Sequence, residues 1–277
     1  DRGSTFNGFF NNYDGLASGL QPIGVKYDDA SRKVVCTLEQ DDIMDGLNWL
    51  HKWYQDGIIN PDANVVTDGG KGSIFGSAQG WPAAATTWAF NAGIEKYDLT
   101  QVFGPLYTTE TIQGSMNAIS ANSKYKTEAL KVLQLMNTDS KFRDMCAYGT
   151  EGNYMEYAED GTVQKLRDDW NWPSYTQGTF FILSTQADGD PDAWNQVKEQ
   201  NESAVSSTCL GFALDVTNIQ NEIANCNTVW DKYKNDLLTG ASDPATAVPA
   251  CIEELKAAGL DTVIEEAQKQ VDEFFAN

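Results

Sequence analysis

The residues best suited to chemistry in this sequence are aromatic rings set among polar side chains. Trp81 lies in a Gly-Trp-Pro sequence, and a second group in one short stretch comprises Trp170, Trp172, Tyr175 and Gln177. A flat ring packs on the apolar face of a sugar, while amides, hydroxyls and carboxylates meet its hydroxyl groups. The alternative is that these rings pack beneath loops, and composition alone favours neither interpretation.

A further aromatic group lies in the first twenty residues, which are rich in glycine and asparagine. Phe10 and Tyr13 are the candidates for ligand contact in this region, because here too aromatic rings stand among polar groups. The many glycines predict an irregular loop here.

Signals for catalysis are weak. His51 is the single histidine, so there is no histidine pair for zinc and little room for a histidine-based triad. Its helical surroundings predict an ordinary packed or surface histidine. Neither a nucleophile elbow nor a phosphate-binding or dinucleotide-binding loop stands at a strand–helix junction. We therefore expect a binding protein and not an enzyme, with no catalytic residue, cofactor or metal. With 40 acidic residues, some carboxylate pair is always available, so a glycosidase stays open as an alternative.

The acidic run from Asp188 to Glu199 is similar to a calcium-binding loop in its spacing. However, Ala193 stands where such a loop needs glycine, and Pro191 begins a helical pattern. The alternative that we favour is an acidic helix N-terminus, which the helix dipole stabilises.

The five cysteines fit no metal-binding spacing, and their odd number precludes complete internal pairing. We expect buried free thiols that behave as small apolar residues. A Cys209–Cys226 disulfide is the alternative, since sequence does not set the geometry that it needs. The cysteines are Cys36, Cys146, Cys209, Cys226 and Cys251.

The overall charge restricts the partners. The 277 residues carry a formal charge of −21 and are 41% hydrophobic, which is a globular composition. So acidic a chain repels nucleic acid and anionic lipid. No apolar run approaches the roughly 20 residues that a membrane-spanning helix needs. The chain begins Asp-Arg-Gly-Ser without a signal peptide, which says nothing about localisation.

Periodicity and turn residues predict an α/β chain. Hairpins are expected over 25–35 and 154–166, the second around Asp160-Gly161. We expect a Thr217/Gln220 capping box and a C-terminal cap at Gly240 for the helix over 218–238. Helices are expected over 41–56, 126–136, 140–148, 191–204, 218–238, 245–258 and 261–275, with another ending at Phe90; short strands are expected over 73–75, 102–103, 115–120 and 179–184.

Five stretches, in this order, resemble the extracellular solute-binding proteins of bacterial ABC importers. The resemblance is to the family 1-like, lipoprotein-type members of the sugar- and oligosaccharide-binding branch, whose C-terminal region carries a domain of unknown function. The stretches are 46–62 with Tyr-Gln-Asp-Gly-Ile-Ile-Asn-Pro-Asp, 71–81 with Lys-Gly, 120–133 with Ser-Lys-Tyr-Lys-Thr-Glu-Ala-Leu-Lys, 148–154 with Tyr-Gly-Thr-Glu-Gly-Asn-Tyr, and 211–275.

This resemblance implies a type II periplasmic-binding-protein clamshell, in which two α/β lobes joined by crossover strands close on the ligand. The sequence departs from the family at its start, where much of the N-terminal lobe is expected to be lacking. Residues 1–101 and 149–277 would form mainly the C-terminal lobe with its helical C-terminal region. A crossover would lie near 102–106, and 107–148 would pack with the other lobe.

The resemblance also implies residues and partners. Trp81 matches the aromatic residue that stacks on sugar in the family, Glu151 lies in a loop near the cleft, and Gln113 follows the crossover. The protein would capture an oligosaccharide or a related polar solute and deliver it to ABC permease subunits. We expect a monomer at the extracellular face, held by a lipid anchor outside this sequence, or in the periplasm. A peptide-binding receptor of the same fold is the main alternative; a glycan-acting hydrolase and a structural surface protein are weaker ones.

Overall fold

Contacts along the chain divide it into two units, each with its own helices and strands. Unit 1 comprises Asp1–Gln79, Leu106–Ile112 and Val205–Asn277, and unit 2 comprises Gly80–Pro105 and Gln113–Ala204. The computed structural model describes residues 6, 8–66, 80–82, 84, 88, 94, 98–167, 169, 170, 172, 174, 176–187 and 189–276. The strand expected over 73–75 and most of the helix expected to end at Phe90 lie outside the described residues.

Unit 1 begins with a small antiparallel sheet in the order β1-β2-β3. Ile23 pairs with Cys36 and Gly24 with Val35, which confirms the expected hairpin, although its strands are displaced by about two residues from the expected ones. Within the first twenty residues, 8–14 are more regular than expected, because they form a short 3-10 helix and β1. The elements are η1 (Gly8–Asn12), β1 (Tyr13–Asp14), β2 (Ile23–Lys26), β3 (Val35–Cys36) and η2 (Thr37–Glu39).

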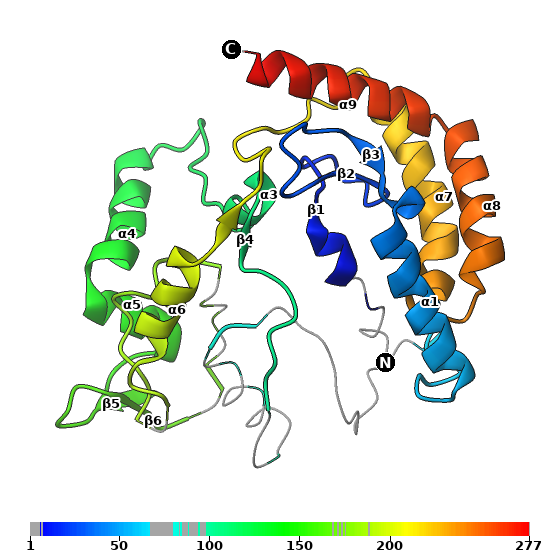
Figure 1. Ribbon diagram of the computed structural model, residues 1–277. Helices are drawn as coiled ribbons and strands as arrows, with labels where there is room; N and C mark the ends of the chain where they lie inside the picture. Colours follow the sequence, from blue (N-terminus) through cyan, green and yellow to red (C-terminus); the bar gives the residue numbers. More distant parts are fainter. Residues whose placement is uncertain are drawn as a thin grey trace. The chain divides into compact units, whose positions relative to one another are not determined.

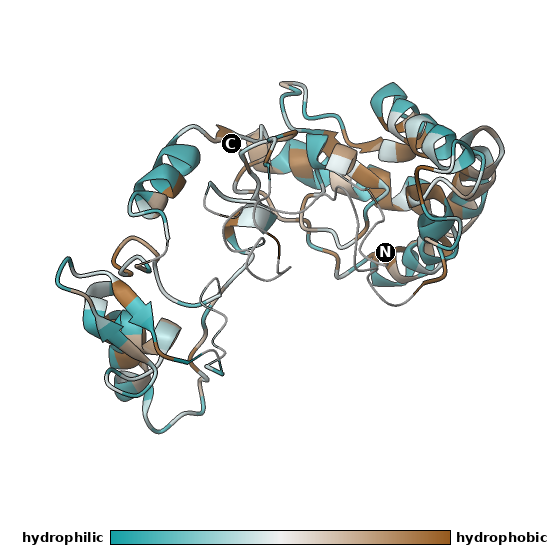
Figure 2. Cartoon of the chain, turned by 90° about the horizontal axis from the view of Figure 1, so that it is seen from below, coloured by the Kyte–Doolittle hydropathy of each residue, from teal (hydrophilic) through white to brown (hydrophobic). Residues whose placement is uncertain are grey.

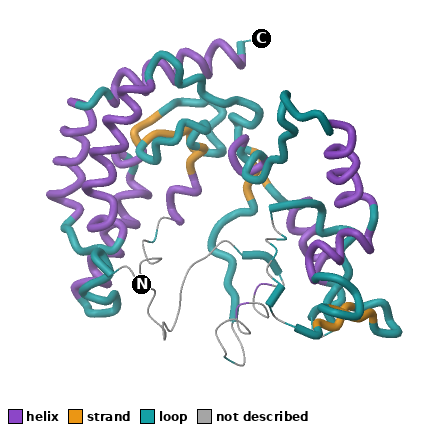
Figure 3. Tube along the Cα trace, turned by 180° about the vertical axis from the view of Figure 1, so that it is seen from behind, coloured by secondary structure: helices purple, strands orange, loops and turns teal. Residues whose placement is uncertain are grey.

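Four helices of unit 1 form one packed group (Figures 1 and 3), in which α7 contacts α1, α8 and α9. Each buries one face; in α1 this face is Ile43, Leu47 and Leu50, as the 3–4 spacing predicts. Hydrophobic and hydrophilic residues accordingly alternate along the helices (Figure 2). The helices are α1 (Asp41–Gln55), α7 (Gln220–Leu238), α8 (Pro244–Ala257) and α9 (Leu260–Phe275).

The contact between α1 and the end of α7 depends on a glycine. Gly240 has φ +77°, and a Cβ there would lie 2.2 Å from the Leu50 carbonyl oxygen. The ring Nδ1 of His51 donates to the Gly240 carbonyl oxygen at 2.7 Å. His51 is thus a packed helix histidine, as expected. The capping box predicted at the other end of α7 was wrong, because Thr217 bonds to the Asp215 carboxylate instead.

Unit 1 also holds a short parallel pair formed by β4 (Leu106–Tyr107) and β7 (Val205–Ser206), followed by α3 (Thr109–Ile112). The strand expected over 102–103 was wrong, since Val102 is exposed and the pairing begins only after Pro105. Two apolar residues carry too little information to place a strand. The strand that does form, β4, pairs with β7 about a hundred residues away, and local sequence does not reveal such a partner.

Unit 2 is built on two consecutive helices and a hairpin. Helix α5 has the bounds predicted for it, and the hairpin turns at Gly161, whose φ is +83°. The buried cluster of this unit is Tyr148, Met155, Val163 and Leu183. The elements are α4 (Lys126–Thr138), α5 (Ser140–Tyr148), β5 (Met155–Tyr157), β6 (Val163–Lys165) and α6 (Ala193–Glu202).

Two further expected strands were wrong. Residues 115–120 and 179–184 form no strand in the described structure, and Phe181 is half exposed. Residues 179–184 are held by hydrogen bonds with side chains of α5, and not by pairing with a neighbouring strand. Contacts within this chain group 113–148 with 149–204, whereas the expected lobes divide the chain at 148. The lobe assignment therefore stays a prediction for the complete protein.

Helix α4 is unusual because it buries only Met136. Leu130, Val132 and Leu135 are 59%, 46% and 40% exposed. We call these three the exposed apolar residues of α4. The same helix carries Asn137, whose Oδ1 accepts from the Thr179 N–H. No described helix is long and apolar enough to cross a membrane.

Candidate ligand-binding site

The site begins with a buried arginine on α5. Arg143 is fully buried; its Nε donates to the Thr179 carbonyl oxygen at 3.0 Å and its Nη2 to the Ser174 carbonyl oxygen at 2.9 Å. Burial lowers the pKa of Arg143, and these two carbonyl dipoles compensate part of the loss of water around the charge, whereas the buried Nη1 has no hydrogen-bond partner. The guanidinium therefore ties Ser174 to Thr179, on either side of Gln177.

The next residue, Asp144, is buried too and holds the far end of the same segment. Its Oδ1 accepts from the Ser184 backbone N–H at 2.9 Å, and its Oδ2 accepts from the Ser184 hydroxyl at 2.8 Å and the Tyr157 hydroxyl at 2.9 Å. The Tyr148 hydroxyl donates to the Ser184 carbonyl oxygen at 2.8 Å. Burial and the hydrogen bond to Asp144 raise the pKa of Tyr157. The helix, the hairpin and the segment are thus tied together.

Trp170 is joined to the turn that carries Glu151. Its indole N–H donates to the Cys146 carbonyl oxygen at 3.0 Å, and its ring lies 5.2 Å from the ring of Tyr154. The Arg167 guanidinium lies 4.7 Å from the Tyr154 ring centroid on the same turn. Glu151 is exposed, three residues before Tyr154. The structure therefore brings the expected Glu151 loop and the expected Trp170 stretch together.

The rest of that stretch lies on the segment held by Arg143. Trp172 is 36% exposed, which leaves ring surface for a ligand, and Gln177 is half-buried. Gly178 has φ +72°, and a Cβ there would lie 2.8 Å from the Met136 carbonyl oxygen, so this position requires glycine. Tyr175 lies outside the described residues.

Trp81 and Gln113 belong to unit 2 but stand apart from this group. Trp81 is half-buried, and its ring meets the ring of Trp88 edge-on at 5.8 Å. Gln113 is exposed directly after α3. Among the described residues, no hydrogen bond or ring contact joins either of them to Trp170.

Phe10 and Tyr13 lie in the core of unit 1. The Phe10 ring packs 5.2 Å from Phe9 and 6.1 Å from Trp230, and the Tyr13 hydroxyl donates to Asp42 Oδ1 at 2.7 Å. Burial raises the pKa of Tyr13. Because both rings are buried, a ligand arriving from solvent does not reach them in this structure.

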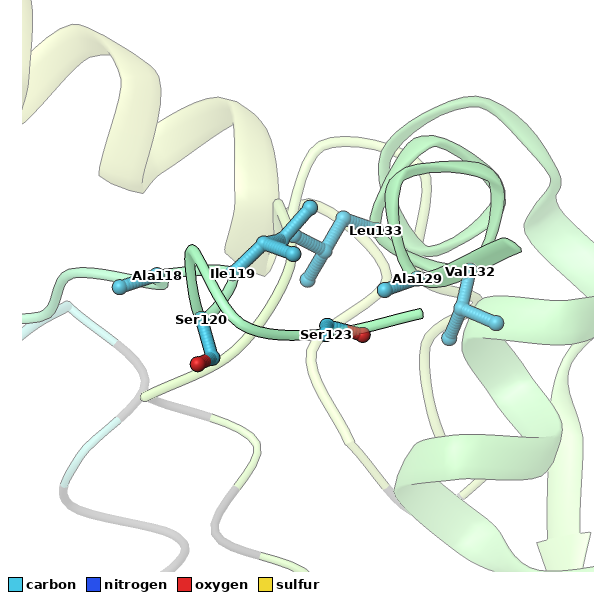
Figure 4. A pocket seen from close by; sticks show the side chains of 7 residues that line it. All are labelled: Ala118, Ile119, Ser120, Ser123, Ala129, Val132 and Leu133. Atoms are coloured by element: carbon cyan, nitrogen blue, oxygen red, sulfur yellow. The ribbon is translucent and has the colours of Figure 1, made fainter. Parts of the chain in front are cut away.

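Two hollows lie on unit 2. One of about 410 Å³, lined by Ile119, Ala129, Val132 and Leu133 with two serines, is apolar and gives a sugar few partners (Figure 4). The other hollow, of about 300 Å³, is lined by polar side chains, which suit the hydroxyl groups of a sugar, and by one exposed aromatic ring. The residues that supply these groups are Asp160, Thr162, Phe181, Thr185 and Asn195. Sequence reasoning did not single them out, although Asp160 stood at the predicted hairpin turn.

Metal and disulfide chemistry find little support. The Asp190 carboxylate accepts from the Asp192 N–H at 2.9 Å and from the Gln196 side-chain amide at 2.8 Å, so its oxygens are engaged by hydrogen bonds at the start of α6. The described residues hold no group of three metal-ligating side chains. All five cysteines are free, which confirms free thiols over the Cys209–Cys226 pair. Four are buried and Cys146 is half-buried.

Comparison with known proteins gives consistent results. Residues 208–276 match the model of a domain of unknown function, DUF3502. A carbohydrate ABC transporter substrate-binding protein of Streptococcus pneumoniae serotype 4 (strain ATCC BAA-334 / TIGR4) is 27% identical in an alignment that covers 95% of this chain and 55% of that protein. The chain thus spans about half the length of this curated relative.

Solved structures agree. The crystal structure of the N-glycan transport solute binding protein NgtS from Streptococcus pneumoniae superposes with a TM-score of 0.84 at 26% identity, over 96% of this chain and 61% of that one. Its complex with Man5GlcNAc gives a TM-score of 0.75 at 26% identity, over 96% and 61% of the two chains. An HMO binding, ABC-transporter associated solute binding protein from Bifidobacterium longum infantis ATCC 15697 gives a TM-score of 0.52 at 14% identity, over 93% of this chain and 60% of that one, which supports the fold alone. The expected relationship and fold class are confirmed: the chain is related to the solute-binding proteins of carbohydrate ABC transporters and carries part of their clamshell fold.

Proposed function

We propose that the complete protein is the substrate-binding component of a bacterial ABC importer, capturing an oligosaccharide and delivering it to membrane permease subunits. The observation that carries this proposal is the 27% identity to a carbohydrate ABC transporter substrate-binding protein along 95% of the chain. Structures of the related NgtS were solved with Man1GlcNAc and Man5GlcNAc. Oligosaccharides of mannose and N-acetylglucosamine are therefore the ligands to test first.

The proposed contacts are those that combine rings with polar groups in unit 2. They are Trp81, Gln113, Glu151, Trp170, Trp172, Tyr175 and Gln177. Stacking and hydrogen bonding would supply the affinity, and closure of the two lobes would follow from tighter binding to the closed state. No proton transfer or covalent step is required of any of these residues, in keeping with a binding protein and not an enzyme.

The cellular setting is proposed from the same relationship. The protein would act as a monomer outside the cell membrane, held there by a lipid anchor, or in the periplasm. Its surface would present the loaded ligand to the permease.

Calorimetric titration of the full-length protein with Man5GlcNAc tests the proposal. Saturable binding is expected, and mass spectrometry should recover the glycan intact, whereas a hydrolase would shorten it. A panel of peptides serves as the comparison, because a peptide receptor of the same fold would bind peptides and ignore the glycan. Absence of binding to every glycan tested would contradict the sugar proposal.

A further inference from the structure

We propose that Arg143 and Asp144 of α5 are positioning residues, which order the described residues between Trp170 and Ser184 in the shape that meets the ligand. This inference rests on the proposed function of that segment. Neither side chain is expected to touch the ligand, because Arg143 is fully buried and Asp144 nearly so.

The first step of the argument is the geometry of Arg143. Its two hydrogen bonds end on carbonyl oxygens five residues apart, at Ser174 and Thr179, so one planar group holds both residues. A lysine in its place would keep the charge but would lack the fork of donors that reaches both oxygens. The planar guanidinium of Arg143 therefore matters for its fork of donors as well as for its charge. The Arg143→Lys variant keeps the charge and removes the fork.

The second step is the number of attachments that converge on the same region. The Asp144 carboxylate holds Ser184, the Cys146 carbonyl oxygen accepts from Trp170, and Asn137 Oδ1 at the end of α4 accepts from the Thr179 N–H at 3.0 Å. The segment between Trp170 and Ser184 contains no strand or helix among its described residues. Side chains of α4 and α5 therefore supply the order that regular secondary structure supplies elsewhere.

The third step separates this role from ordinary core packing. The buried cluster of unit 2 is apolar, and Leu183 is its member from the segment. Trp172 and Phe181, which the segment also carries, are exposed. An ordered exposed segment is useful to a binding site, because its conformational entropy is already lost before the ligand arrives. Releasing it should weaken binding while the apolar core stays intact.

The test uses the full-length protein and its Arg143→Lys variant, with Man5GlcNAc as the probe. We expect at least tenfold weaker binding, together with faster amide hydrogen exchange over 170–184 and unchanged exchange in β5 and β6. Binding within twofold of the wild type in a folded Arg143→Lys variant would overturn the inference, even if exchange were faster.

Two further variants serve as a control and as an alternative test. Arg32 in unit 1 also donates from Nε to a backbone carbonyl oxygen, that of Thr208 at 2.8 Å, so Arg32→Lys is the matched control and should bind normally. If Arg143→Lys fails to fold, Asn137→Ala removes a single attachment from an exposed residue and should weaken binding about threefold. Unchanged binding in Asn137→Ala would then overturn the inference.

Failure of the proposed function has a different outcome. If the wild type binds no glycan, that function is wrong, and hydrogen exchange alone decides the ordering role. Faster exchange over 170–184 in Arg143→Lys would support that role, and unchanged exchange would contradict it.

Discussion

The ring of Tyr154 packs against the indole of Trp170, with centroids 5.2 Å apart. This placement requires glycine at position 149, because Gly149 follows α5 with φ +91° and a Cβ there would lie 2.5 Å from the Tyr154 Cβ. The short turn after α5 thus carries both the exposed Glu151 and Tyr154, whose ring contacts Trp170. This ring contact joins the turn to the aromatic segment within unit 2.

Replacing Trp81 with alanine should weaken glycan binding by the full-length protein about tenfold or more, because the stacking platform is lost. Calorimetric titration with Man5GlcNAc measures this. Trp49→Ala is the control, since Trp49 is an exposed indole on α1 of unit 1. Equal affinity of the Trp81 variant and the wild type would remove Trp81 from the site.

Asp144→Asn should lower the free energy of unfolding of unit 2 by about 2–4 kcal/mol, because an amide cannot accept every bond that the buried carboxylate accepts. Urea unfolding followed by hydrogen exchange of 140–184 checks the loss. Asp139→Asn makes the same chemical change at the N-cap of α5, where Asn caps as well as Asp, and should be nearly neutral. Equal stability of the two variants would contradict the role of Asp144.

Gly240→Ala should destabilise unit 1 by about 3 kcal/mol or more, because strain at positive φ adds to a clash with the Leu50 carbonyl oxygen. Gly57 has φ +73° but open space around it, so Gly57→Ala isolates the strain and should cost about 1–2 kcal/mol. Thermal or urea unfolding of both variants gives the difference. Similar losses in both would mean that α1 and the end of α7 adjust to relieve the clash.

Thiol labelling should distinguish Cys146 from the other four cysteines. At pH 8 we expect the half-buried Cys146 to react first, while the buried thiols wait for unfolding. Burial raises the pKa of Cys36, Cys209 and Cys226 to about 11 and that of Cys251 to about 12. A colorimetric thiol assay should report all five in denaturant. Rapid labelling that persists in Cys146→Ser would contradict this order.

The same buried thiols predict a loss of stability in alkali. Folded thiols keep their protons to about pH 11, whereas unfolded thiols release theirs near their ordinary value of 9.0. Unfolding therefore releases protons above pH 9, and the free energy of unfolding should fall by up to about 1.4 kcal/mol per pH unit for each fully shifted thiol. Urea midpoints at pH 8 and pH 10.5 measure this fall. Cys251→Ala removes one of the four shifted thiols and should make the fall smaller, and equal midpoints at the two pH values would exclude the effect.

Local signals in the sequence predicted local structure well. Helix α5 and the β5–β6 hairpin were predicted because apolar spacing and an Asp-Gly turn act within a few residues. Strands over 102–103, 115–120 and 179–184 were wrong, because a short apolar run does not show whether a partner strand exists.

The candidate site was predictable in part for the same reason. The grouping of Trp170, Trp172 and Gln177 was visible as composition. Arg143 and Tyr154 were missed, since a charged helix residue looks solvent-exposed in sequence, and its burial depends on carbonyls 31 and 36 residues away. The four-residue spacing of Asp144 and Tyr148 was the available signal, because both lie on the buried side of α5.

The exposed apolar residues of α4 have a consequence for handling the protein. Uncovered leucines and valines on a helix surface attract similar surfaces, so a polypeptide of residues 1–277 is expected to become turbid and scatter more light as its concentration rises. Its strongly negative charge opposes this attraction, and added salt should weaken that opposition. Such a preparation should therefore remain clear in buffers of low ionic strength. The variant Leu130→Lys should also remain clear, because it removes one exposed apolar side chain.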